Sequence, residues 1–165
     1  MSITQADVLE FFQYEDGKLF WKKRSANRTV VGSQISFVEN TGYIRVRFKG
    51  KHYGIHQIIF LMHYGYIPEH VDHVDGEKLN NKIENLRAAT KSENALNKKV
   101  RCDSASGIKN VHWYEPLKKW RVAVSINKKR KHIGYFDDLE LAELVSIEAR
   151  EKFHGAFSSF SCRGI

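Results

Sequence analysis

Between residues 72 and 94 the chain carries side chains that could act together on a phosphodiester bond. Asp72 and His73 are adjacent, and Asn85 and Asn94 follow within a polar stretch. Carboxylate and amide oxygens are hard ligands of the kind that Mg²⁺ and Mn²⁺ prefer. A histidine, with its ordinary pKa of about 6.5, can serve as a general base near neutral pH. The pattern predicts a divalent-metal site in which a histidine activates water for attack on phosphorus.

The surrounding sequence predicts the elements that must position these side chains. Residues 71–74 are apolar around Asp72 and His73 and read as the end of a strand, and residues 75–76 turn the chain. Residues 83–89 are expected to return as a second strand. Thr90 and Glu93 have the spacing of a capping box, which predicts a helix over residues 91–98. This strand, loop, strand and helix would bring Asp72, His73 and Asn94 together.

Upstream, the pattern predicts a helix over residues 4–12, a hairpin turn at residues 16–17, two strands at 43–48 and 51–55, and a buried helix over 55–64 that ends at Gly65. In the strand at 43–48 and the turn after it, apolar and basic residues alternate, so one face builds core and the other is cationic. That cationic face is either an ordinary solvated surface or a ribbon that contacts phosphates. Its members are Arg45, Arg47 and Lys49.

Length and composition fit a globular protein, and its positive charge fits either a polyanionic partner or a soluble protein that is merely basic. The chain has 165 residues, 42% hydrophobic and 12% aromatic, and its formal net charge is +8. Two cysteines outside any CxxC spacing argue against a structural zinc site or a disulfide scaffold and favour a reducing cytoplasm. No signal peptide or membrane-spanning run is expected, so we predict a protein that is not secreted and does not partner a membrane.

A second unit follows the stretch of small residues at 102–107, which reads as a linker. Three short strands are predicted at 111–114, 120–126 and 132–136, followed by a helix that Asp137 and Asp138 cap and that runs to His154. An apolar stripe on this helix would cover one face of the sheet. The other face would stay bare, and basic residues collect on it.

The first unit resembles the HNH endonucleases, whose active site is a ββα-metal motif. The similarity is greatest to the phage and intron homing type, in which the last histidine of the motif is replaced by asparagine. This resemblance covers roughly residues 52–97. It implies that His73 is the general base, that Asn85 braces the loop holding it, and that Asp72 and Asn94 bind Mg²⁺ or Mn²⁺. His56 matches a histidine in the preceding helix of that family, and we predict it to contact DNA.

Residues 106–157 resemble the DNA-binding domain of plant ethylene-response (APETALA-type) transcription factors, through Trp120, the segment 134–137, Ala142, Ala149 and Gly155. In that family the bare sheet lies in the major groove of DNA. Ala123 and Ser125 stand where the plant proteins carry a charged pair, so the plant sequence preference should not transfer. The residues predicted to contact DNA from this sheet are Lys109, His112, Tyr114, Arg121, Ser125, Arg130 and His132.

The sequence therefore predicts an α+β protein with a ββα-metal unit preceded by β-hairpins, followed by a three-stranded antiparallel sheet packed on one helix. The expected domains are an HNH unit at 1–101 with its core at about 52–98, a linker at 102–107, a DNA-binding domain at 108–158 and a tail at 159–165. The function expected is a metal-dependent, homing-type endonuclease of double-stranded DNA that nicks one strand as a monomer or weak dimer. A non-catalytic DNA-binding regulator and a protein acting on RNA remain alternatives.

Overall fold

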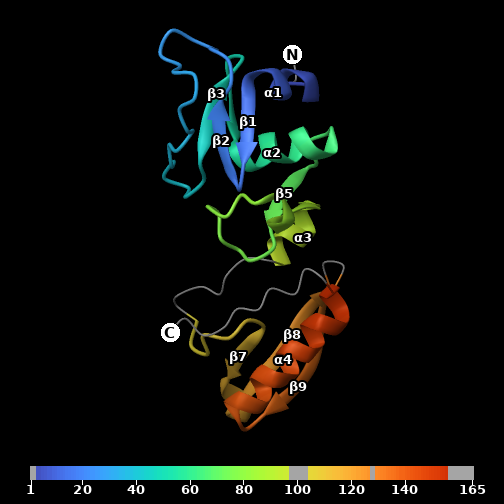
Figure 1. Ribbon diagram of the computed structural model, residues 1–165. Coiled ribbons are helices and arrows are strands. Elements are labelled where there is room, and N and C mark those ends of the chain that lie inside the picture. Colours follow the sequence, from blue (N-terminus) through green and yellow to red (C-terminus); the bar gives the residue numbers. More distant parts are fainter. Residues whose placement is uncertain (1–2, 97–103, 127–128, 156–165) are drawn as a thin grey trace. The chain divides into compact units, whose positions relative to one another are not determined.

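The computed structural model describes residues 3–96, 104–126 and 129–155, and has a mixed α+β architecture built from small antiparallel sheets (Figure 1). The predicted fold class is confirmed. The helices and strands are α1 (Gln5–Phe11), β1 (Phe12–Glu15), β2 (Lys18–Trp21), β3 (Arg45–Phe48), β4 (Lys51–Gly54), α2 (Ile55–Tyr64), β5 (His70–His73), β6 (Leu86–Ala89), α3 (Lys91–Leu96), β7 (Val111–Tyr114), β8 (Lys119–Ile126), β9 (Lys129–Phe136) and α4 (Leu139–His154).

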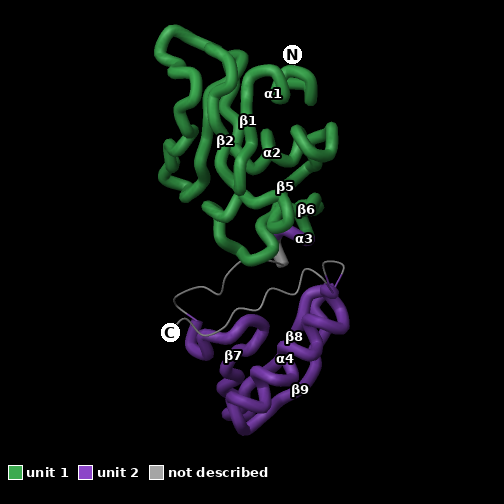
Figure 2. Tube along the Cα trace, in the orientation of Figure 1, with its two compact units in different colours: residues 1–92 green, residues 93–165 purple. Residues whose placement is uncertain are grey.

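The contacts between residues divide the chain into two compact units, residues 1–92 and residues 93–165 (Figure 2). The division falls inside α3, before the linker that the sequence places at 102–107. Residues 102 and 103 of that linker lie outside the described residues, as does the expected tail at 159–165. Each unit has its own core.

The first unit opens with a capped helix and a tight hairpin, both as predicted. The side chain of Thr4 accepts a hydrogen bond from the backbone of Asp7, and the Asp7 carboxylate accepts one from the backbone of Thr4, which completes a capping box. The hairpin β1–β2 turns at Asp16 and Gly17, whose φ angles are +43° and +80°. A two-residue turn with positive φ at both central residues has a backbone twist that matches the twist of the paired strands. Phe12 begins β1 rather than ending the helix.

A second hairpin, β3–β4, leads directly into α2. Its turn at Lys49 and Gly50 again has positive φ at both residues. Gln57 caps the start of α2 by accepting a hydrogen bond from the backbone of Gly54 at 3.0 Å. The helix ends at Gly65, which has a left-handed backbone. The predicted bounds of α2 are confirmed.

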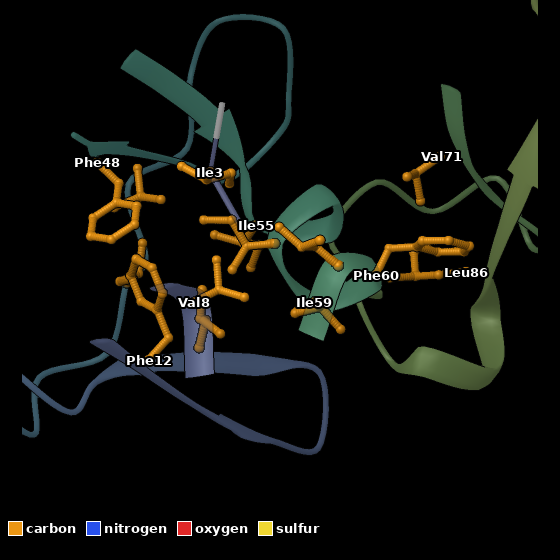
Figure 3. Close-up of a cluster of buried hydrophobic side chains, with 14 residues drawn as sticks. Ile3, Val8, Phe12, Phe48, Ile55, Ile59, Phe60, Val71 and Leu86 are labelled. Carbon is orange, nitrogen blue, oxygen red and sulfur yellow. The ribbon is translucent and has the colours of Figure 1, made fainter. Parts of the chain in front are cut away.

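Both hairpins and α2 contribute to one hydrophobic core, shown in Figure 3. Phe12 lies with its ring centroid 4.9 Å from that of Phe48, and 4.7 Å from that of Trp21. Ile55, Ile58 and Ile59 supply the buried face of α2. The core extends to Val71 on β5 and Leu86 on β6, so the same packing that holds the hairpins also anchors the strands carrying the candidate site.

The strands β5 and β6 pair antiparallel, with Asp72 opposite Arg87 and His73 opposite Leu86. The predicted second strand began too early, since residues Ile83–Asn85 form a single 3₁₀ turn and β6 starts only at Leu86. The physical reason is the side chain of Asn85, which bonds across the loop and draws these residues into a turn. Turn bonding of this kind competes with a strand ladder.

In the second unit β7, β8 and β9 form an antiparallel sheet in that order, and α4 packs on one of its faces (Figure 1). Asp138 caps α4 by accepting a hydrogen bond from the backbone of Leu141 at 2.8 Å. Val111 and Val122 are fully buried against Ala142 of the helix. The three predicted strands and the predicted helix are present, but β9 begins at Lys129 rather than at the predicted His132, because residues 129–131 also pair with β8. In the described residues no helix has both the length and the apolar character needed to cross a membrane.

Candidate functional site

Asp72 and His73 occupy the end of β5, and both are nearly inaccessible, with exposed fractions of 5% and 4%. Their neighbour in the core is Val71, which anchors the strand. Burial of a carboxylate and an imidazole costs free energy unless both groups are hydrogen-bonded. Each of the two has such a partner.

Asn81 is the hydrogen-bond partner of His73. The Nε2 atom of His73 lies 3.1 Å from Oδ1 of Asn81. The amide Nδ2 of Asn81 donates to the carbonyl of Leu79 at 3.1 Å. With an exposed fraction of 1%, Asn81 is among the most deeply buried polar side chains of the described residues. The loop between β5 and β6 therefore reaches back to hold the imidazole.

Asn85 braces this loop from its other end. Its Oδ1 accepts a hydrogen bond from the backbone of Asp75 at 3.0 Å, and its Nδ2 donates to the Asp75 carboxylate at 2.9 Å and to the Asn80 carbonyl at 2.8 Å. Burial raises the pKa of Asp75, but hydrogen bonds from the backbone of Glu77 and from the two asparagines outweigh it, and the net pKa is lowered. These bonds hold the loop together, and the catalytic bracing role of Asn85 stays a prediction.

Asp72 forms a close ion pair with Arg87 on the facing strand. The Nε and Nη2 atoms of Arg87 lie 2.8 and 2.7 Å from Oδ2 of Asp72. Their side chains are 6% and 17% exposed, so water screens this pair only weakly. The negative charge of Asp72, the predicted metal ligand, is thus partly neutralised by Arg87 within the β5–β6 hairpin.

A metal site at this position would use oxygen donors. In the described part of the chain no group of three or more His, Cys, Asp and Glu side chains is arranged to hold a metal. The donors that the sequence predicts are one carboxylate, Asp72, and one amide, Asn94 in α3. This hard donor set fits Mg²⁺ or Mn²⁺, although the ion would have to share the Asp72 carboxylate with Arg87 or displace it. The joint role of Asp72 and Asn94 stays a prediction.

Two aromatic rings, those of His56 and Tyr43, lie around the imidazole of His73. The ring centroid of His56 lies 5.3 Å from that of His73, and the ring of Tyr43 lies 5.1 Å from His56 and 6.0 Å from His73. Burial, followed by the charges of His73 and Arg45, lowers the pKa of His56 to about 4. Burial and the Asp72 charge raise the pKa of Tyr43. His56 thus lies beside the predicted base, and a DNA contact by His56 stays a prediction.

Lys78 lies at the edge of this ring cluster. Its Nζ atom is 4.9 Å from the centroid of the Tyr43 ring and donates to the carbonyl of Thr41 at 2.8 Å. A cation over an aromatic face is attracted by the ring quadrupole. The contact ties the loop before β3 to the loop after β5.

The hairpin β1–β2, which precedes the site in the chain, contacts the loop between β5 and β6. The hydroxyl of Tyr14 accepts a hydrogen bond from the backbone of Ile83 at 3.1 Å. Gly17 lies so close that a Cβ there would be 2.9 Å from the backbone nitrogen of Lys82. Lys82 and Asp16 form an exposed ion pair at 2.8 Å. These contacts fix the backbone next to Asn81.

The predicted cationic face of β3 is partly neutralised. Arg45 pairs with Glu39 at 3.1 Å, and Lys49 pairs with Asp7 at 2.6 Å. Arg47 is exposed and, in the described residues, makes no such ion pair. Of the three residues, Arg47 is best placed to meet a phosphate, and the DNA contact of all three stays a prediction.

In the second unit the face of the sheet opposite α4 gathers basic and aromatic side chains. The guanidinium of Arg121 lies 5.5 Å from the centroid of the Tyr114 ring, and the Tyr135 ring lies 5.1 Å from that of Tyr114 and 4.5 Å from that of His132. The strand register places further predicted residues on this face. It sets His112 opposite Arg121 and Arg130 opposite Ser125.

Two further observations concern this face. Burial, together with the charges of Arg130 and Arg121, lowers the pKa of His112. The Nε atom of Arg121 is buried without a hydrogen-bond partner in the described residues. Lys109 precedes β7 and is half-buried. The strand register thus gathers the predicted residues of β7, β8 and β9 on one surface, and their contact with DNA, like that of Lys109, stays a prediction.

Five residues of the two sites were not predicted from the sequence: Asn81, Arg87, Tyr43, Lys78 and Tyr135. Arg87 could have been found, because an arginine on the strand opposite an aspartate is a common ion pair. Tyr135 was hidden by the irregular register between Val122 and Ala123, which changes the alternation along β9.

Comparison with known proteins places these observations in a family. Residues 53–96 match the model of an HNH endonuclease family. Protein 3.8 of Escherichia phage T7 is 34% identical over 98 residues, which cover 58% of this chain and 80% of that protein. This chain belongs to the HNH endonuclease family, as a relative of the phage protein. The HNH segment contains Asp72, His73, Asn81, Asn85 and Asn94. No solved structure matches the chain significantly.

Proposed function

We propose that this HNH protein is a metal-dependent endonuclease of double-stranded DNA, of the homing type. In this proposal His73 is the general base, Asp72 and Asn94 bind Mg²⁺ or Mn²⁺, and Asn85 braces the loop that holds the base. One site per chain would nick one strand, and the protein would act in the host cytoplasm as a monomer or weak dimer. The second unit would position the nuclease on its substrate.

The burial and bonding of His73 within the HNH segment carry this proposal. The residue is 4% exposed, its ring is held by Asn81 at 3.1 Å, and it follows Asp72 at the end of β5. A general base must be held in a fixed position relative to its water molecule, and the hydrogen bond to Asn81 can do this. The bracing of the same loop by Asn85 supports this reading.

The reaction requires a proton acceptor, an aligned water molecule and relief of charge on the phosphate. His73 would take a proton from water as the oxygen of that water bonds to phosphorus, and the bond from phosphorus to the 3′-oxygen would break. A bound divalent ion would supply electrostatic stabilisation of the phosphate and of the departing oxygen. The ring cluster of Tyr43, His56 and His73 would limit bulk water on one side of the base.

The sheet of the second unit is proposed to contact DNA, in the manner of the plant APETALA-type domain that it resembles. Support comes from its three strands and covering helix, and from the basic side chains on the face opposite α4. Arg121 and Arg130 provide guanidinium groups suited to guanine edges or phosphates. Lys109, His112, Tyr114, Ser125 and His132 would complete the contact, and Arg45, Arg47, Lys49 and His56 would contribute from the first unit.

The decisive experiment is incubation of supercoiled plasmid with the full chain and Mg²⁺ or Mn²⁺. We expect nicked circles that disappear when EDTA is added and are reduced by orders of magnitude in His73→Ala. Nicking that persists in EDTA, or that His73→Ala leaves unchanged, would overturn the mechanism.

A second candidate function is a non-catalytic DNA-binding regulator in which the HNH fold is a scaffold. The observation that favours it is the ion pair of Arg87 with Asp72 at 2.7 Å, because the guanidinium already neutralises the carboxylate that is proposed to bind the metal. This candidate predicts retention of duplex DNA without metal-dependent cleavage. Competition between duplex DNA and RNA at a stated salt concentration would test the remaining candidate, an RNA-directed protein.

A further inference from the structure

Asn81 holds the imidazole of His73 through an amide whose orientation is fixed by a backbone atom. Its Nδ2 faces the carbonyl oxygen of Leu79 at 3.1 Å, and its Oδ1 faces Nε2 of His73 at 3.1 Å. A carbonyl oxygen only accepts hydrogen bonds, and an amide NH₂ only donates them. The opposite orientation would set Oδ1 of Asn81 against the oxygen of Leu79, so the NH₂ group must face Leu79.

This orientation determines where His73 carries its proton. Because Oδ1 of Asn81 is an acceptor, Nε2 of His73 must be the donor. In a neutral imidazole only one nitrogen carries hydrogen, so the lone pair lies on Nδ1. When the ring is protonated, the bond from Nε2 to Asn81 is kept and becomes charge-assisted, which is stronger.

We propose that Asn81 is a positioning residue that fixes the tautomer and ring orientation of His73, so that Nδ1 is the atom that takes the proton from water. This inference rests on the proposed function, in which His73 is the general base. It goes beyond the HNH motif residues, because Asn81 belongs neither to the metal ligands nor to the loop brace formed by Asn85. A wrong tautomer at a catalytic histidine can cost on the order of 10⁴-fold in kcat.

The placement of Asn81 supports a dedicated role. The residue is 1% exposed, yet it lies in a polar loop whose neighbours Leu79 and Asn80 are exposed or half-buried. The adjacent backbone is held by Tyr14, whose hydroxyl accepts a hydrogen bond from Ile83, and it passes so close to Gly17 that a Cβ there would lie 3.2 Å from the backbone carbon of Asn81. A clamped loop can hold the amide oxygen at a fixed position, which preorganises the ring.

Two variants separate the positioning role from a purely structural one. Asn81→Leu and Asn81→Asp both lose the donor to Leu79, but only Asn81→Asp keeps an acceptor for Nε2 of His73. Leu79→Ala is the matched control, because its side chain is 57% exposed and its backbone carbonyl remains. If Asn81 serves structure alone, Asn81→Asp should be at least as damaging as Asn81→Leu.

The direct test is ¹⁵N NMR of the ring nitrogens in full-length, metal-free protein labelled at histidine, with the His73 signals identified by their loss in His73→Ala. We expect hydrogen on Nε2 in the wild type, in Leu79→Ala and in Asn81→Asp, and a mixture of tautomers in Asn81→Leu. In the nicking assay we expect kcat to fall at least 100-fold in Asn81→Leu with little change in KM, and to stay within about 10-fold in Asn81→Asp.

Hydrogen on Nδ1 in the wild type would overturn the inference without any variant having to fold. Equal loss of kcat in Asn81→Asp and Asn81→Leu would also overturn it. Absence of cleavage by the wild type would instead refute the proposed function, while the NMR result would still decide whether Asn81 sets the tautomer. The two failures are therefore distinguishable.

Discussion

Arg87 donates hydrogen bonds to Oδ2 of Asp72 from both Nε, at 2.8 Å, and Nη2, at 2.7 Å. The two residues lie directly opposite each other in the β5–β6 hairpin. The pair is buried, so either member left alone would be a poorly solvated charge. Asp72 is also the carboxylate that we propose as a metal ligand. A bound cation and the guanidinium would therefore act on the same negative charge.

Arg87→Met should destabilise the protein by about 3 kcal/mol, because it leaves the Asp72 carboxylate buried without its guanidinium. Mg²⁺ should restore more stability to this variant than to the wild type, since the ion binds Asp72 without a competing cation. Urea unfolding with and without Mg²⁺ measures both effects. The control, Lys23→Met, removes an exposed pair with Glu10 and should cost at most about 1 kcal/mol. No added protection by Mg²⁺ in Arg87→Met would argue against Asp72 as a ligand.

Gly17→Ala should impair the site through the loop that contains Asn81. The new Cβ would meet the backbone nitrogen of Lys82 at 2.9 Å, which the loop can relieve only by shifting. Gly50→Ala is a matched control, with φ of +79° against +80° for Gly17 and no atom within 4 Å of the new Cβ. Backbone strain should lower the free energy of unfolding of both variants by about 1 kcal/mol. In Gly17→Ala the contact with Lys82 should lower it further, and this variant should nick DNA at least 10-fold more slowly than Gly50→Ala. Equal nicking rates in the two variants would contradict a role for the contact.

The partly buried imidazole of His56 should make stability depend on pH. Its pKa is lowered to about 4 by burial and by the charges of His73 and Arg45, whereas an unfolded histidine titrates near 6.5. Between these values the unfolded state binds the extra proton, so stability is full above pH 6.5 and falls as the pH drops toward 4. From pH 7 to pH 5 the loss should be about 2 kcal/mol. Urea unfolding should show a shallower dependence in His56→Gln, and an unchanged slope would contradict this origin.

Arg121→Ala should weaken DNA binding without changing the chemical step. The guanidinium lies on the sheet face opposite α4, against Tyr114, and loss of one good base or phosphate contact is worth about 10-fold in affinity. The control, Lys152→Ala, removes the same charge from the helix that covers the other face. Fluorescence anisotropy at fixed salt measures binding, and nicking at saturating DNA measures kcat. Unchanged affinity in Arg121→Ala would count against the sheet as the DNA-facing surface.

Local patterns in the sequence predicted most of the elements. The caps at Thr4 and Asp138, the turns at residues 16–17 and 49–50, and the glycine that ends α2 all depend on near neighbours, and the structure confirms them. The onset of β6 was predicted wrongly, because Asn85 bonds to Asp75 and Asn80 across the loop. That competition depends on the loop geometry rather than on the strand pattern.

The candidate site was predictable in its motif residues but not in their support. Asp72, His73 and Asn85 stand out by type and spacing. Asn81 and Tyr43 become recognisable only when the loop and the ring cluster are in place. Which nitrogen of His73 faces Asn81 is a property of three-dimensional packing, and no spacing rule encodes it.

The hydrogen bond from the backbone of Ile83 to the hydroxyl of Tyr14 joins positions 69 residues apart in the chain. The segment that carries the HNH signature, residues 53–96, therefore lacks one of the groups that hold its own loop. The HNH segment therefore depends on a residue outside itself and is not structurally self-sufficient. A transplant of that segment into another scaffold would have to bring the first hairpin with it, and recombination between related genes should preserve the two together.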